Sequence, residues 1–209
     1  YARKSGGGED RTTVIGYGGA NKDNVIVPDG FLTIGTQAFY SCGISKITLP
    51  DGLTTIGNND FNANNLTELA IPDTVTSIGN GAINSNNFPE ETAYLFARKS
   101  DGSIDETTLV SYGGKSSKIV TIPSTVKTIK SNSVERLSYA DTIIIPEGVE
   151  VIENNAFRKG NYYNPSLTTI VNQTGRSFDW GQIINGTSGY SFVSGTVINS
   201  YGNVEVVSQ

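Results

Sequence analysis

The stretch ITLPDGLTTIGNNDF, residues 47–61, contains the pattern that decides the fold. Ile47 and Leu49 share one face of a short strand, because side chains alternate along an extended chain. The proline that follows has no backbone N–H and ends the strand, and Pro-Asp-Gly is typical of a turn. Ile56 then points back to the same interior from a second short strand, and Phe61 fills the corner after it.

The same pattern occurs five times along the chain. Prolines at positions 28, 50 and 72 are 22 residues apart, and those at 123 and 146 are 23 apart. One unit cannot cover its own apolar face, but units stacked at the ~4.8 Å spacing of neighbouring strands share a continuous core. The sequence therefore predicts a solenoid of β-rich coils. The five units read VIVPDGFLTIGTQAF, ITLPDGLTTIGNNDF, LAIPDTVTSIGNGAI, VTIPSTVKTIKSNSV and IIIPEGVEVIENNAF.

These units resemble the BspA-type leucine-rich repeat family, whose bacterial repeats read apolar-x-Ile-Pro, Val-x-x-Ile-Gly and then Ala-Phe. The resemblance covers residues 24–172 apart from an insertion, and Ile83 and Val134 replace the phenylalanine in two units. It implies a right-handed β-rich solenoid of the leucine-rich repeat type. It also implies a bacterial surface protein that adheres to host matrix proteins or to other cells.

A second and longer repeat interrupts the first. LFARKSDGSIDETTLVSYGG at 95–114 is a near copy of YARKSGGGEDRTTVIGYGG at 1–19. At a constant offset of 95 residues, 15 of the 34 positions in 2–35 are identical to those in 97–130. An Asp-Gly turn followed by alternating residues predicts an inserted β-hairpin. Because Tyr1 aligns with Phe96, inside the first strand of the hairpin, we expect further repeats upstream and a chain that is a fragment of a larger protein.

We expect one continuous solenoid domain with a C-terminal β cap. Phe178, Ile183 and Ile184 lie at helical spacing around Trp180, and two or three short β segments follow. An aromatic ligand pocket around Trp180 and Tyr190 is the alternative to a cap. The predicted segments are a truncated hairpin element (1–19), three coils (20–88), an inserted hairpin element (89–118), two coils (119–174) and the cap (175–209).

The composition removes most catalytic chemistry. No histidine occurs and Cys42 is the only cysteine, which excludes His-dependent nucleophiles and His metal sites. Asp101-x-Ser103-x-Asp105 lacks the glycine and the final glutamate of a calcium loop. The turn acids occur singly, whereas a glycosidase needs a pair. We expect no enzymatic activity, no cofactor and no metal site.

The net charge of −5 argues against nucleic acids and anionic membranes as partners, because both require clustered basic residues. No apolar run reaches the ~18 residues of a membrane-spanning helix, so we expect no membrane insertion of this segment. Cys42, Asn64 and Asn86 recur at a spacing of 22 residues. We expect their side chains to satisfy buried loop amides, which would make the thiol buried and unreactive.

Function must then lie in the outward-facing positions. The residues between the buried strand positions would stack into one flat stripe of small and apolar side chains, and an ordinary solvated sheet surface is the alternative interpretation. The candidate binding residues on this stripe are Lys46, Thr48, Glu68, Ala70, Thr121 and Ile144.

We expect a non-catalytic interaction or adhesion module of a secreted or cell-surface bacterial protein. The expected partner is a host matrix protein, a cell-surface protein or a glycan, and the fragment itself is expected to be monomeric. A structural spacer that holds other domains away from the cell wall is the alternative. A glycan-acting enzyme ranks third.

Overall fold

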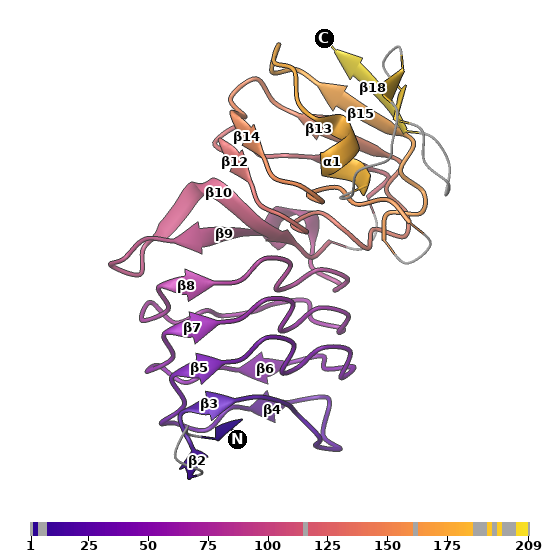
Figure 1. Ribbon diagram of the computed structural model, residues 1–209. Helices are drawn as coiled ribbons and strands as arrows, with labels where there is room; N and C mark the ends of the chain where they lie inside the picture. The colour runs from indigo at the N-terminus through magenta and orange to yellow at the C-terminus, as the bar shows by residue number, and fades with distance from the viewer. Residues whose placement is uncertain are drawn as a thin grey trace.

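The computed structural model describes residues 2–3, 8–114, 117–160, 163–185, 192–193, 196–197 and 204–208. The chain winds into a β solenoid of about seven turns, which confirms the predicted fold class (Figure 1). The N-terminal coils lie at one end of the stack, and the C-terminal strands lie at the other.

The first two N-terminal coils each contribute two short strands, which lie on different sides of the core, and the third contributes one. On one side the strands form a parallel sheet in the order β3-β5-β7-β8, in which Ile34 pairs with Ile56 and Ile56 pairs with Ile78. On the other side β4 pairs with β6 in parallel. The strands are β3 (Thr13–Val14), β4 (Val25–Ile26), β5 (Thr33–Ile34), β6 (Ile47–Thr48), β7 (Thr55–Ile56) and β8 (Ser77–Ile78).

The predicted hairpin inserts into the stack as β9 (Tyr94–Arg98) and β10 (Ile104–Tyr112), after a short 3-10 helix, η1 (Glu90–Thr92). Ala97 pairs with Asp105 in this antiparallel hairpin. At the N-terminus β1 (Ala2–Arg3) and β2 (Glu9–Asp10) pair in the same register shifted by 95 residues, because Ala2 lies opposite Asp10. The long-range sequence duplication is therefore also a duplication of backbone pairing.

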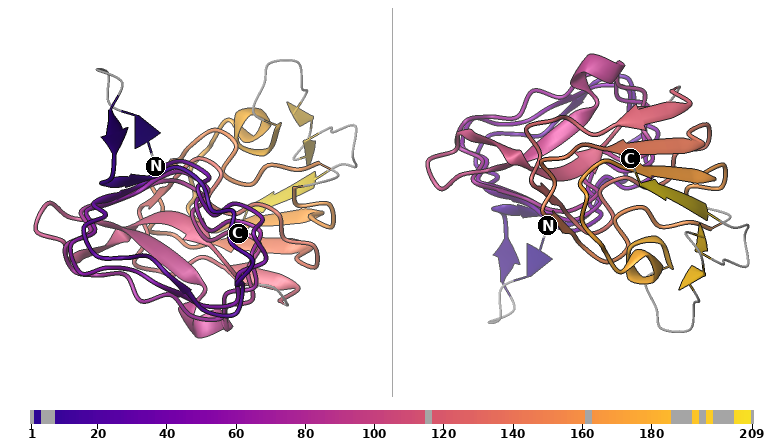
Figure 2. Two further views of the ribbon diagram at one scale, coloured as in Figure 1. Left: turned by 90° about the horizontal axis from the view of Figure 1, so that it is seen from below. Right: turned by 90° about the horizontal axis from the view of Figure 1, so that it is seen from above.

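The hairpin joins the two blocks of coils. β10 pairs in parallel with β12 just as β3 pairs with β5, again 95 residues earlier. The other side of the second block is a separate sheet in which β11, β13, β15 and β18 are neighbours, and these strands fan out in Figure 2. The strands are β11 (Ile119–Thr121), β12 (Thr128–Ile129), β13 (Thr142–Ile145), β14 (Val151–Ile152), β15 (Thr169–Asn172) and β18 (Val204–Ser208).

The C-terminal segment caps the last coil, as predicted. The helix α1 (Trp180–Asn185) takes the position of the next corner, because the N–H of Phe157 donates to the carbonyl of Ile183 just as the N–H of Phe61 donates to that of Ala82 one coil on. β18 pairs in parallel with β15 and antiparallel with β17 (Thr196–Val197), which in turn pairs with β16 (Phe192–Val193). Trp180 is buried against Phe178, whereas Tyr190, the second residue of the alternative aromatic pocket, lies outside the described residues.

The core follows the predicted columns. Ile34, Ile56, Phe39, Phe61 and Phe157 are buried, and the rings of Phe39 and Phe61 stack at 5.7 Å from coil to coil. Each corner begins with a residue of positive φ, a conformation that Asn and Gly accept most readily. This column consists of Gln37, Asn59, Gly81, Asn132 and Asn155.

The asparagine column satisfies buried loop amides as predicted. The Asn64 side-chain oxygen accepts from the N–H of Ile44 at 2.9 Å, and its amide nitrogen donates to the carbonyl of Phe39 at 2.8 Å. Asn86 makes the equivalent bonds one coil later. The expectation of a buried Cys42 is wrong: the residue is half-buried, and residues 18–24, in the turn of chain before it, are themselves exposed.

Candidate interaction surface

The candidate stripe residues lie on the outer side of the strands. Val25 and Val27 point into the core while Ile26 between them is 65% exposed, as the alternation along a strand requires. The candidate residues Lys46, Thr48, Glu68, Ala70 and Thr121 are exposed, and Ile144 is half-buried.

The stripe is not continuous along the solenoid. Lys46, Thr48, Glu68 and Ala70 lie together in the first block, whereas Thr121 and Ile144 are paired neighbours in the second. The start of the inserted hairpin lies between them, and the hydroxyl of Tyr94 donates to the carbonyl of Thr121 at 2.7 Å. The expected single flat surface is therefore two patches, because the insertion takes the place of a regular coil.

The first patch is a groove, which we name the β6 groove, with a volume of about 640 Å³. Lys46 and Glu68 form an exposed ion pair at 3.7 Å across it. Leu69 and Ile71 are only partly buried, so apolar side chains are accessible in the groove. It is lined by Lys46, Ile47, Thr48, Leu49, Asp51, Glu68, Leu69, Ala70, Ile71 and Pro72.

One edge of the β6 groove is an unpaired strand edge. The carbonyls of Lys46 and Thr48 accept from the N–H groups of Val25 and Val27, so these carbonyls face β4. In a parallel strand the groups of the intervening residue face the opposite way. In the described part of the chain β6 has no paired strand on that side, and Ile47 is one of the residues that line the groove.

A cavity that sequence reasoning missed lies at the corner side of the coils, with a volume of about 320 Å³. Tyr139 is 60% exposed at its rim, and the Arg136 guanidinium lies over the rings of Tyr40 and Tyr163. The recurrence of Asn65 and Asn87 at a spacing of 22 residues could have indicated one side of this cavity. The other side comes from residues within 114–139, which follow the inserted hairpin. The lining residues are Ala63, Asn64, Asn65, Ser85, Asn86, Asn87, Gly114, Arg136, Ser138 and Tyr139.

Two buried carboxyls have perturbed acidity. Burial raises the pKa of Asp60 to about 7, although it accepts backbone hydrogen bonds from Ala38 and Gly57. Burial also raises the pKa of Glu135 to about 7, against the opposing effect of the Arg136 charge 3.9 Å away. A raised carboxyl pKa in a cleft suggests an acid catalyst, but neither residue lines the β6 groove or the corner cavity.

The hairpin acids are engaged within their own turns. Asp101 accepts from the N–H and hydroxyl of Ser103 at 2.9 and 2.6 Å, and Asp105 does the same with Thr107 at 3.1 and 2.6 Å. These bonds lower the pKa of both carboxyls. Among the residues that the structure describes, no three acidic, Cys or His side chains gather closely enough to hold a metal ion. No helix in the same residues is long and apolar enough to cross a membrane.

The chain is similar to solved bacterial leucine-rich repeat proteins. A leucine-rich cell surface protein from Faecalibacterium prausnitzii A2-165 is 24% identical, with a TM-score of 0.52 over 71% of this chain and 41% of that one. The pneumococcal vaccine antigen PcpA is 18% identical, with a TM-score of 0.43 over 73% of this chain and 51% of that one. The chain thus spans only about half, or less, of the length of these proteins. No curated protein matches it.

The family model decides the classification. The model of the BspA type leucine rich repeat region matches residues 17–94 and 108–178 in six copies, one more than the proline spacing indicates. The unmatched stretch between them is the outer part of the β9–β10 hairpin. The chain therefore belongs to the BspA-type leucine-rich repeat family.

Proposed function

We propose that this chain is a non-catalytic interaction module of a bacterial surface protein, and that it binds an extended segment of a partner protein in the β6 groove. Family membership and the F. prausnitzii cell surface protein support the surface location. The observation that carries the binding mode is the free edge of β6 beside partly buried apolar side chains.

An extended peptide suits this groove for two reasons. An exposed strand edge offers backbone N–H and carbonyl groups to an added strand, which supplies affinity without a particular side-chain sequence. Leu69 and Ile71 offer an apolar surface to alternate side chains of that strand. The exposed Lys46–Glu68 pair contributes at most about 1 kcal/mol, so either charge can exchange its partner for a charge on the ligand.

A binding array of host matrix proteins, bacterial surface proteins and glycans tests the proposal. Each ligand found should be measured against Thr48→Lys/Ala70→Lys, a double variant within the groove, and Thr121→Lys, a matched control on the second patch. All three positions are exposed, so circular dichroism should be unchanged. We expect the groove variant to weaken binding of a protein ligand at least about tenfold, or about 1.4 kcal/mol, and the control to bind as the parent does.

Three outcomes contradict this proposal in different ways. Equal binding by the parent and the groove variant places the site elsewhere, with the corner cavity as the next position to mutate. Binding of glycans alone excludes strand addition. Failure to bind any ligand, in monomeric or multivalent form, favours the spacer function instead, because multivalent display reveals even weak sites.

A further inference from the structure

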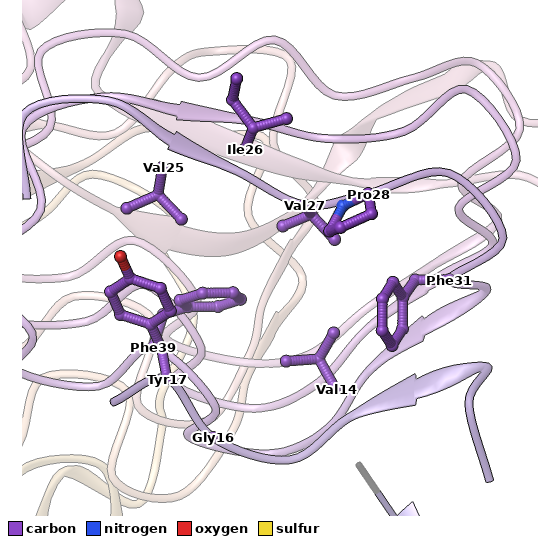
Figure 3. A pocket seen from close by; sticks show the side chains of 9 residues that line it. All are labelled: Val14, Gly16, Tyr17, Val25, Ile26, Val27, Pro28, Phe31 and Phe39. Atoms are coloured by element: carbon purple, nitrogen blue, oxygen red, sulfur yellow. The ribbon is translucent and has the colours of Figure 1, made fainter. Parts of the chain in front are cut away.

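An apolar cavity of about 290 Å³ opens at the N-terminal end of the solenoid core. Figure 3 shows the side chains of Val14, Tyr17, Val25, Phe31 and Phe39 around it, between the segment at 14–17 and strand β4. Its volume lies below the ~300–1,000 Å³ of most small-molecule sites, and its lining combines mostly apolar side chains with some polar surface. The cavity therefore suits one large side chain better than a soluble metabolite. Gly16, Ile26, Val27 and Pro28 complete the lining.

The molecule contains a second copy of this site in a filled state. At the offset of 95 residues, Val14 corresponds to Leu109 and Tyr17 corresponds to Tyr112. Leu109 and Tyr112 are 0% and 1% exposed, whereas Val14 and Tyr17 are only half-buried. The remaining lining positions correspond to Ser111, Val120, Thr121, Ile122, Pro123, Val126 and Val134.

The half-buried side chain of Tyr94 packs against the second copy. Its ring lies 4.9 Å from the ring of Tyr112, and its hydroxyl donates to the carbonyl of Thr121 at 2.7 Å. Thr121 corresponds to Ile26, in the edge strand β4 of the first copy. The first copy therefore has an aromatic ring, Tyr17, where the second has Tyr112, and a strand carbonyl, that of Ile26, where the second has that of Thr121.

Strand pairing indicates where along the chain a tyrosine would have to lie to reach this cavity. In the hairpin, Tyr94 pairs with Tyr112 and Leu95 with Ser111, immediately before the part of β9 that is repeated in β1. β1 pairs with β2 in the register of Ala97 with Asp105, and two register shifts in β10, on either side of Leu109, separate that part of the hairpin from the Tyr94–Tyr112 pair. A strand that extends β1 backward by the same path would therefore place a tyrosine beside Tyr17.

We propose that the cavity is a docking site for a tyrosine side chain carried by a Tyr-Leu segment of a further leucine-rich repeat coil, joined in the same polypeptide ahead of β1. The ring would pack against Tyr17 and Phe39, and its hydroxyl would donate to the carbonyl of Ile26. The cavity face of the first coil would then be an interface for a preceding coil that is arranged like residues 69–95.

A fusion of the chain to its own sequence tests this proposal. Residues 69–95 are copied in front of Tyr1, so that the copied Leu95 joins Tyr1 and the duplicated hairpin becomes complete. We expect the melting temperature to rise by roughly 5–10 °C, as for burial of an aromatic side chain in a domain of this size. Amide hydrogen exchange at 14–17 and 25–27 should slow to the rate found at 109–112 and 120–122.

Two variants of the fusion distinguish the effect of the tyrosine side chain from the effect of the added coil. Alanine at the copied Tyr94 position should remove most of the gain, and phenylalanine should keep the packing but lose protection near Ile26. The proposal is wrong if the alanine fusion is as stable as the tyrosine fusion, or if the tyrosine fusion gains neither stability nor protection. A concentration-dependent dimer of the original chain that the fusion abolishes would also overturn it, since a second copy would then fill the cavity.

Discussion

The buried carboxyl of Asp60 makes a prediction that can be worked through from the structure. Asp60 is 0% exposed in a corner where the neighbouring coils place Ala38 and Ala82. It accepts from the N–H of Ala38 at 3.1 Å and from the N–H of Gly57 at 2.6 Å. Both N–H groups also donate to backbone carbonyls, so replacing Asp60 with Ala leaves neither donor without a partner.

The pKa of Asp60 rises to about 7 from its ordinary value of 3.8 because burial disfavours the charged form. The folded state therefore binds this proton more tightly than the unfolded state does. The resulting stability is fully present below about pH 4 and is lost as the pH rises through 7. A rise in pKa from 3.8 to about 7 corresponds to a change of up to about 4 kcal/mol in the free energy of unfolding.

Urea unfolding of Asp60→Ala and the parent at pH 4, 5.5, 7 and 8 measures this effect. The comparison should be made in a Glu135→Gln background, because the pKa of Glu135 is also raised to about 7. We expect the stability of the alanine variant relative to the parent to increase steadily between pH 4 and pH 8. A difference between the two proteins that stays constant over this range would refute the assignment of a buried, proton-binding Asp60.

Other experiments test the coil register, the packing of the hairpin turn at Gly102 and the burial of Cys42. Phe61→Ala should lower the free energy of unfolding by about 3–5 kcal/mol, whereas Tyr40→Ala at a half-buried position should cost much less; equal melting temperatures would contradict the register. Gly102→Ala should destabilise by at least about 1–3 kcal/mol in chemical denaturation, because its φ is +85° and an ideal Cβ would lie 1.8 Å from a backbone carbonyl oxygen, while Gly52→Ala, with open space around it, serves as the neutral control. Cys42 should react with a thiol reagent more slowly than in urea and faster as the pH rises, because burial raises its pKa; native labelling as fast as unfolded labelling would contradict this.

The sequence predicts the features that repeat within one coil. Ile34 and Ile56 are placed by strand alternation, and Asn64 is placed by the need to satisfy loop amides, both of which act over a few residues. These features appear in the structure as expected because each coil contacts mainly the next one.

The features that were missed depend on which coils become neighbours. The contact from Tyr94 to Thr121 divides the candidate stripe, and it exists only because the hairpin takes the place of a coil. Arg136 reaches Tyr40 across 96 residues for the same reason. The β6 groove depends on a local failure of pairing at residues 69–71, whose LAI sequence is as strand-like as that of its neighbours. No signal within a single unit reveals these two contacts or the groove.

The hydrogen bonds between coils point along the stack, and this orientation has a mechanical consequence. Gly57 donates to Ile34 in the coil before it, and Gly79 donates to Ile56 in turn. A force that pulls the two ends of the solenoid apart therefore acts on one layer of bonds at a time. Each coil that detaches replaces a rise of ~4.8 Å with an extended chain of about 70–80 Å. A tether built in this way would lengthen in steps and absorb work at each one, while the coils still in the stack remain folded.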